Sequence, residues 1–145
     1  MDILSIDRVQ LNSSAATKKE AIQRAGDLLV ESGCVEADYV PGMFAREDTM
    51  STYLGNGVAI PHGMHESVQY IKKSAISVVQ IPAGVDWEDG EKAHLVIGIA
   101  ALGDDHMVIL SNLAEAIEEF DTVLALANAE DAQFIIDRLT AEPVE

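Results

Sequence analysis

The sequence predicts a single α/β domain in which a mixed β-sheet of about five strands is flanked by helices on both sides. Residues 74–81 and 93–102 carry almost no charge, which is typical of central strands buried on both faces. Segments with helical periodicity precede and follow these strands, and that alternation indicates an α/β domain. The chain has 145 residues, 48% of them hydrophobic, and no linker or repeat divides it, so we expect residues 1–145 to form one domain.

The N-terminal part of the chain is expected to contain one strand and two helices. Residues 6–11 are interpreted as an opening strand. Thr17 begins a helix, because TKKE is a capping box and apolar residues then recur every three or four positions until Gly33. A second helix follows from Asp38, which places Pro41 in a first turn where a missing N–H is tolerated.

The rest of the chain is expected to supply the remaining strands and helices. Residues 58–60 form a short strand, and residues 67–71 lie in a short helix. A Gly-Asp-Asp turn after the second central strand begins another helix, and two short helices follow near residues 121–127 and 131–140. The apolar stripe of the helix after that turn is expected at Met107, Leu110, Leu113, Ala114 and Ile117.

Charge and composition exclude several classes of protein. The chain has 25 acidic and 9 basic residues, a formal net charge of −16, which repels nucleic acids and anionic lipid surfaces. No apolar run of about 18 residues and no signal peptide is evident, so we expect no membrane insertion and a cytoplasmic protein. The single cysteine, Cys34, excludes an intramolecular disulfide and is expected to be a small buried residue.

His62 is the first candidate functional residue, because it follows a short apolar strand and lies between Pro61 and Gly63. Pro61 fixes its own φ, while Gly63 lets the chain turn sharply and leaves no side chain to crowd the imidazole. With Arg46 upstream, the arrangement is typical of a nucleophilic nitrogen beside a cation, as phosphoryl transfer onto protein requires. The alternative is a buried histidine whose nitrogens are satisfied by backbone groups, and these residues alone leave both interpretations open.

His106 and Arg46 are the other candidates. His106 follows the turn that ends the strand over residues 93–102 and begins a helix, where N–H donors and a partial positive charge favour a phosphoryl group. We expect it to support His62, although it is also compatible with an exposed residue at a helix start. Arg46 can bind phosphoryl oxygens bidentately, or it can simply belong to the charged end of a helix.

Two further histidines are interpreted as not functional, and nothing in the sequence supports a partner contact for Trp87. His65 lies three positions after His62 and invites a metal site, but the pair lacks the spacing of a helical H-x-x-x-H motif, so we expect no metal. Its proximity to His62 is expected to affect the access to that ring or its pKa. His94 is expected at a strand edge, and Trp87 in an acidic loop rich in turn residues.

One long motif resembles a known family. The segment REDTMSTYLGNGVAIPHG, residues 46–63, together with VQIPAGVDW and AHLVIGIAALGDDHMVILSNLAEAI, is similar to the IIA component of the mannitol/fructose family of the bacterial phosphoenolpyruvate-dependent sugar phosphotransferase system. The similarity is greatest to the mannitol branch. The resemblance implies a phosphocarrier that accepts a phosphoryl group on His62 from the carrier protein HPr and passes it to a cysteine of a IIB domain. It also implies Arg46 and His106 as active-site residues, no cofactor, and one sheet with helices on both sides.

This interpretation leaves two alternatives. The first is a regulatory module of the same fold, in which phosphorylation of His62 controls a partner protein. The second is a binding domain that is never phosphorylated. For the phosphocarrier we expect Nε2 of His62 to attack the phosphoryl group, and we expect apolar residues around it to form a rim for docking two different proteins. The rim is expected at Val58, Ile60, Met64 and Met107.

Overall fold

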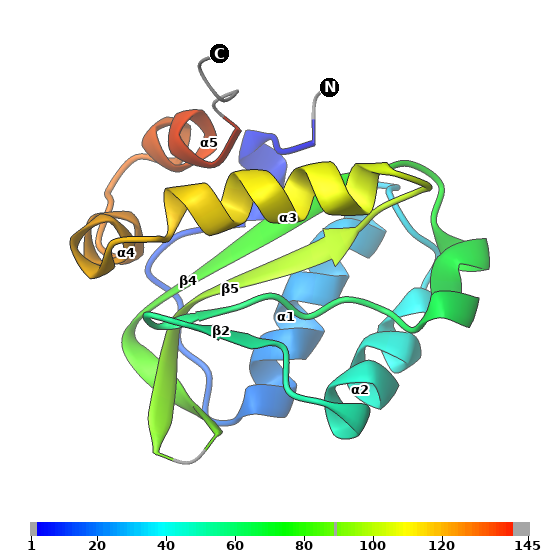
Figure 1. Cartoon of the computed structure of the whole chain (residues 1–145), viewed down its shortest axis with the longest axis horizontal. Helices are drawn as coiled ribbons and strands as arrows, with labels where there is room; N and C mark the ends of the chain where they lie inside the picture. The colour runs from blue at the N-terminus through cyan, green and yellow to red at the C-terminus, as the bar shows by residue number, and fades with distance from the viewer. Residues whose placement is uncertain (1–2, 89, 141–145) are drawn as a thin grey trace.

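The computed structural model describes residues 3–88 and 90–140, which form one five-stranded sheet flanked by helices on both faces (Figure 1). The strand order is β1-β4-β5-β3-β2. Strand β4 pairs parallel with β1 and antiparallel with β5, while β3 pairs parallel with β5 and antiparallel with β2, so the predicted mixed sheet is confirmed. The strands are β1 (Val9–Gln10), β2 (Tyr53–Gly55), β3 (Val58–Ala59), β4 (Ala75–Glu88) and β5 (Glu91–Ala100).

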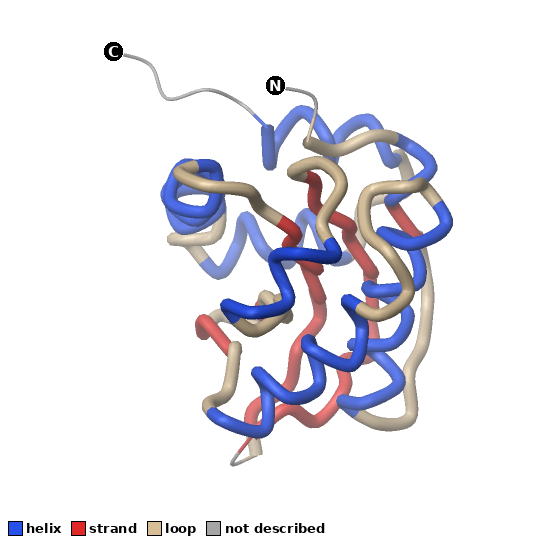
Figure 2. The backbone as a smooth tube through the Cα atoms, turned by 90° about the vertical axis from the view of Figure 1, so that its right-hand side faces the viewer, coloured by secondary structure: helices blue, strands red, loops and turns tan. Residues whose placement is uncertain are grey.

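The helices divide between the two faces of the sheet. On one face lie α1 (Lys18–Glu31) and α2 (Tyr39–Thr49), and on the other lie α3 (Asp105–Ala116), α4 (Phe120–Ala127) and α5 (Ala132–Thr140) (Figure 1). Short 3₁₀-helices occur at η1 (Ile6–Arg8) and η2 (His65–Tyr70). Figure 2 shows the strands passing between these helices.

Two apolar cores result from this layering, one on each face of the sheet. Alternate residues of β4 supply both, because successive side chains of a strand point to opposite faces: Ile76 and Val78 pack toward α3, α4 and α5, whereas Val79 and Ile81 pack toward α1 and α2. The first seven residues of β4 and the last six of β5 are buried, as the absence of charge predicts. No helix within residues 3–88 and 90–140 is long and apolar enough to cross a membrane.

Helix α1 has the ends that the sequence predicts. The Thr17 hydroxyl accepts a hydrogen bond from the Glu20 N–H at 3.2 Å, and the Glu20 carboxylate accepts one from the Ala16 N–H at 3.0 Å. Gly33 follows the helix in the left-handed region at φ +78°, which glycine adopts without steric cost. Helix α2 likewise follows Asp38, although the Asp38 side chain makes no capping hydrogen bond.

The antiparallel pair β4 and β5 extends further than the sequence predicts. The register shifts between Gln80 and Val85, around Pro82 and Gly84, and pairing then resumes at Val85 with Ala93. The prediction of a loop around Trp87 is therefore wrong, because Trp87 lies in β4 with 4% of its surface exposed. His94 lies within β5, and not at its start, because that strand begins at Glu91.

Two other expectations require correction. Only Val9–Gln10 of the predicted opening strand pairs with the sheet, because Ile6–Arg8 forms a 3₁₀-turn first. The buried face of α3 carries Ile109 and Leu113, whereas Met107 is 65% exposed and Ala114 is also exposed. This helix has apolar residues on several sides, so the pattern alone did not define the side that meets the sheet.

Candidate functional site

His62 lies where the chain leaves β3 and runs beside β5. The Ile99 N–H donates to the Pro61 carbonyl at 2.9 Å, and His62 pairs with Ile99 in a parallel bridge. The half-buried imidazole places Nδ1 2.8 Å from the Ile60 carbonyl oxygen. Because a carbonyl oxygen can only accept, Nδ1 carries the proton in this contact, and the lone pair of the neutral ring is on Nε2.

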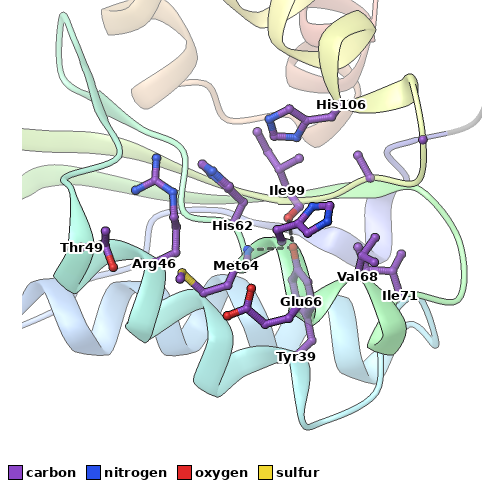
Figure 3. Close-up of a pocket in the computed structure, with 14 residues that line it drawn as sticks. Tyr39, Arg46, Thr49, His62, Met64, Glu66, Val68, Ile71, Ile99 and His106 are labelled. Carbon is purple, nitrogen blue, oxygen red and sulfur yellow. Dashed lines mark hydrogen bonds between the residues drawn. The ribbon is translucent and has the colours of Figure 1, made fainter.

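His106 faces His62 from the first turn of α3. The two ring centroids are 5.3 Å apart, with 60° between the ring planes. Figure 3 shows the His62 side chain between Arg46 and His106, which come from opposite sides of the sheet. The first N–H groups of a helix carry partial positive charge, which favours an anion at the start of α3, while the carboxylates of Asp104 and Asp105 in the same turn oppose it.

Arg46 comes from the last turn of α2 and lines the same cleft. Its Nη1 donates to the Met50 carbonyl at 2.6 Å, which leaves the other guanidinium donors available. The cleft has a volume of about 740 Å³ and is formed by α2, the segment after β3, η2, the end of β5 and the start of α3. The structure thus brings Arg46, His62 and His106 together from three separate stretches of the sequence.

The surroundings of His62 favour its neutral form. Burial is the largest cause and lowers its pKa from the ordinary value of 6.5, because a charged ring loses hydration there. Arg46 and His106 also lower the pKa of His62, while the Ile60 carbonyl and the Glu47 carboxylate act in the opposite direction. At pH 6.5 a free imidazole is half protonated, whereas most His62 rings are neutral and keep Nε2 unprotonated.

Tyr39 fixes the turn that carries His62, and sequence reasoning did not identify it. Its hydroxyl donates to the Ile99 carbonyl at 2.7 Å and accepts from the Gly63 N–H at 2.8 Å (Figure 3). Burial raises the pKa of Tyr39 to about 12, so the hydroxyl remains protonated and can make both hydrogen bonds. These partners lie 24 and 60 positions away along the chain, so no local pattern could have indicated them.

Gly63 has a different role from the sharp turn that the sequence suggested. It is not among the glycines of positive φ in the described chain. A Cβ atom at this position would instead lie 2.7 Å from Cε1 of Tyr39 and 2.9 Å from Cβ of Ser67. Glycine is therefore required by the close approach of the backbone to the Tyr39 ring.

The remaining predicted residues divide between the cleft and the rest of the molecule. Val58 and Ile60 are buried, at 0% and 5% exposure, so their assignment to a docking rim is wrong; Met64 is half-buried and Met107 is exposed. His65 is exposed and lines the cleft. Across residues 3–88 and 90–140 no three side chains of histidine, cysteine, aspartate or glutamate are grouped to hold a metal ion.

Comparisons with known proteins show which family this chain belongs to. The family described as "Phosphoenolpyruvate-dependent sugar phosphotransferase system, EIIA 2" matches residues 2–142. The mannitol-specific phosphotransferase enzyme IIA component of Bacillus subtilis is 40% identical over 136 residues, covering 94% of this chain and 95% of that protein.

Solved structures show the same similarity. The crystal structure of IIA mannitol from Escherichia coli is 36% identical, with a TM-score of 0.87 over 94% of this chain and 99% of that one. Escherichia coli IIAMTL in its complex with phosphorylated enzyme IIBMTL is 34% identical, with a TM-score of 0.90 over 96% of this chain and 98% of that one.

Proposed function

Because the chain belongs to the EIIA 2 family of the phosphoenolpyruvate-dependent sugar phosphotransferase system, we propose that it accepts a phosphoryl group from HPr on His62 and passes it to a cysteine of a IIB domain. The chain is a phosphotransferase component of this system. The observation that carries the finer proposal is the Nδ1 contact with the Ile60 carbonyl at 2.8 Å, which leaves Nε2 of a neutral His62 as the reactive nitrogen.

The first half-reaction transfers the phosphoryl group between two histidines. Nε2 of His62 attacks phosphorus in line, forming one N–P bond while the N–P bond of the phosphorylated donor breaks. Arg46 and the N-terminal turn of α3 offset the negative charge of the equatorial oxygens, and His106 donates a hydrogen bond to one of them. In the second half-reaction a cysteine thiolate of the IIB domain attacks phosphorus. An S–P bond forms while the N–P bond to Nε2 of His62 breaks, and the neutral His62 ring is regenerated.

Two further features belong to this proposal. The IIA relatives named above are mannitol-specific, and one was solved with phosphorylated IIB, which supports mannitol uptake and a IIB partner for this chain. Both exchange partners must reach His62, and the open cleft together with the exposed Met107, which follows His106 in α3, provides apolar surface for them. We place the reaction in the cytoplasm, where phosphoenolpyruvate is available.

The proposal is tested by reconstituting the relay. Incubation with phosphoenolpyruvate, enzyme I and HPr should add one phosphoryl group that is stable in alkali and labile in acid, and His62→Ala should abolish it. His106→Ala is the matched control, because it removes the other histidine of the pair and should still be phosphorylated on His62. Phosphorylation of His62→Ala at the normal level would exclude His62 as the acceptor.

The same reconstitution distinguishes a phosphocarrier for sugar uptake from a regulatory module of the same fold. The phosphorylated protein should transfer its phosphoryl group to the IIB domain of a mannitol permease. Phosphorylation of His62 without transfer to any sugar-system IIB would instead identify a regulatory module.

A further inference from the structure

Glu47 is a buried carboxylate beside the site, and its partners are all neutral. It is 6% exposed and accepts hydrogen bonds from the Thr52 N–H at 2.7 Å, the Thr52 hydroxyl at 2.7 Å and the indole N–H of Trp87 at 3.0 Å. We refer to Glu47, Thr52 and Trp87 as the Glu47 network. Burying a carboxylate is costly unless donors surround it, and all three hydrogen bonds require an acceptor at position 47.

Hydrogen bonds connect the Glu47 network to the imidazole of His62. Glu47 holds both the backbone and the side chain of Thr52. The Thr52 carbonyl accepts from the Ile60 N–H at 3.0 Å, and the Ile60 carbonyl is the group that contacts Nδ1 of His62 at 2.8 Å. Thr52 is therefore connected through Ile60 to the carbonyl that contacts Nδ1 of His62.

The network also restrains the other side of the cleft. Glu47 directly follows Arg46 in α2, and the Arg46 guanidinium donates to the carbonyl of Met50. Met50 lies in the short connection between Glu47 and Thr52. Fixing the two ends of this connection thus fixes the carbonyl that holds Arg46.

We propose that Glu47 is a positioning residue for phosphoryl transfer, which through Thr52 and Ile60 keeps Nδ1 of His62 protonated and Nε2 directed into the cleft. This inference rests on the proposed function. A side chain misplaced by about 1 Å can reduce a rate by roughly a hundredfold, so loss of these restraints is expected to slow transfer without removing the acceptor.

The first test replaces Glu47 by glutamine. In Glu47→Gln the new amide group must face a donor of Thr52 or Trp87, so at least one hydrogen bond is lost. We expect phosphorylation by HPr to slow roughly ten- to a hundredfold. We also expect the ¹⁵N chemical shifts of the two His62 ring nitrogens to converge, because both tautomers become populated. Asp48→Asn is the control: it removes the same charge from the exposed next residue, and its rate and shifts should match wild type.

A second pair of variants separates geometry from charge. Thr52→Val removes one hydroxyl donor while Glu47 remains charged, whereas Thr52→Ser keeps both donors of residue 52. Thr52→Val should change the His62 shifts and the rate in the same direction as Glu47→Gln, and Thr52→Ser should restore both. The fluorescence of Trp87, the single tryptophan of the sequence, reports in each variant whether its contact with Glu47 has changed.

Wild-type shifts and wild-type rates in folded Glu47→Gln would overturn the proposal and leave Glu47 with a purely structural role. If Glu47→Gln does not fold, Thr52→Val decides in the same way, since wild-type behaviour there would also overturn it. The shifts are measured on unphosphorylated protein. A wild-type chain that HPr fails to phosphorylate would therefore refute the proposed function, while the shifts would still decide whether Glu47 orients His62.

Discussion

The protonation state of His62 determines whether its Nε2 can act as a nucleophile. Burial, Arg46 and His106 lower the pKa of His62 below 6.5, so the ring should stay neutral at slightly acidic pH. An NMR titration of His62 should therefore give a midpoint below 6.5, and Arg46→Gln should raise that midpoint by removing a nearby cation. A wild-type midpoint at or above 6.5 would contradict this account of the site.

The same shift links His62 to stability. A lowered pKa means that, as the pH falls through about 6.5, the unfolded chain binds a proton at this histidine before the folded protein does. His62 therefore reduces the free energy of unfolding between pH 6.5 and its folded pKa, and His62→Gln should show a weaker loss of stability over that interval.

Arg46 is the cation that we expect to bind the oxygens of the transferred phosphoryl group. Replacing it by glutamine removes charge-assisted hydrogen bonds of about 1.5 to 3 kcal/mol, so transfer from HPr should slow roughly ten- to a hundredfold. Arg46→Lys should recover only part of the rate, because an ammonium lacks the bidentate geometry of a guanidinium. Chemical denaturation checks that the fold is intact, and an unchanged rate in folded Arg46→Gln would assign the guanidinium to its contact with Met50 alone.

The sequence predicted residues that line the cleft around His62, but not the residues that hold His62 in place. Arg46, His62 and His106 fall within or beside recognisable motifs, and the structure places them around one cleft, while their chemical roles stay predictions. Tyr39 was missed because its partners, Ile99 and Gly63, are distant along the chain. Glu47 was missed because its burial depends on Trp87, 40 positions away, although Thr52 is only five positions from it.

Among the elements, the contact between α2 and the segment after β3 sets the position of the histidine. A Cβ at residue 63 would lie 2.7 Å from Cε1 of Tyr39, so Gly63→Ala should push this segment away from α2. Overpacking of this kind costs about 1 to 3 kcal/mol of unfolding free energy, and the displaced His62 should also accept phosphoryl groups more slowly.

Gly90→Ala is the control for this prediction. Gly90 lies between β4 and β5 at φ +83° with open space around it, so its substitution should strain the backbone without altering the phosphorylation rate. Comparing the two variants by denaturation and by transfer kinetics separates lost stability from lost positioning. Equal rates in both variants would show that the Tyr39 contact does not control His62.

Two predictions about individual elements were wrong: the length of β4 and the buried face of α3. Strand β4 continues past Pro82 and Gly84 because the register shift there absorbs residues that cannot pair regularly, and sequence rules treat such residues as an end. In α3 the buried face could not be chosen, because Ile109 and Met107 are both apolar and only contact with the sheet distinguishes them.

For the whole molecule, the class of fold was predictable and the arrangement of strands was not. Uncharged strands alternating with helical segments correctly predicted a mixed sheet covered on both faces. The order β1-β4-β5-β3-β2 places the short strand leading to His62 beside β5, next to the start of α3. Local periodicity contains no information on which strands become neighbours. The expectation that His106 supports His62 came from its place after a central strand and from the family resemblance, and the structure adds the distance of 5.3 Å between the two ring centroids.

Net charge is a property of the entire molecule and gives the last prediction. The chain carries −16, and among the described residues the only ion pair is that of Arg24 with Glu20. Repulsion between carboxylates should therefore oppose folding at low ionic strength, where the Debye length is about 30 Å at 0.01 M. Raising sodium chloride to about 0.15 M shortens it to about 8 Å and should raise the melting temperature by a few degrees.

Choline chloride at the same ionic strength should raise the melting temperature by the same amount, because screening does not depend on the cation. Sucrose is uncharged and does not screen, so at equal osmolarity the melting temperature should depend differently on its concentration. The gain should also shrink as the pH falls toward 4.3, the isoelectric point, since protonated carboxylates no longer repel one another. A melting temperature that stays constant or falls with salt at neutral pH would mean that attractive pairs, and not the excess of carboxylates, dominate the electrostatics of the folded chain.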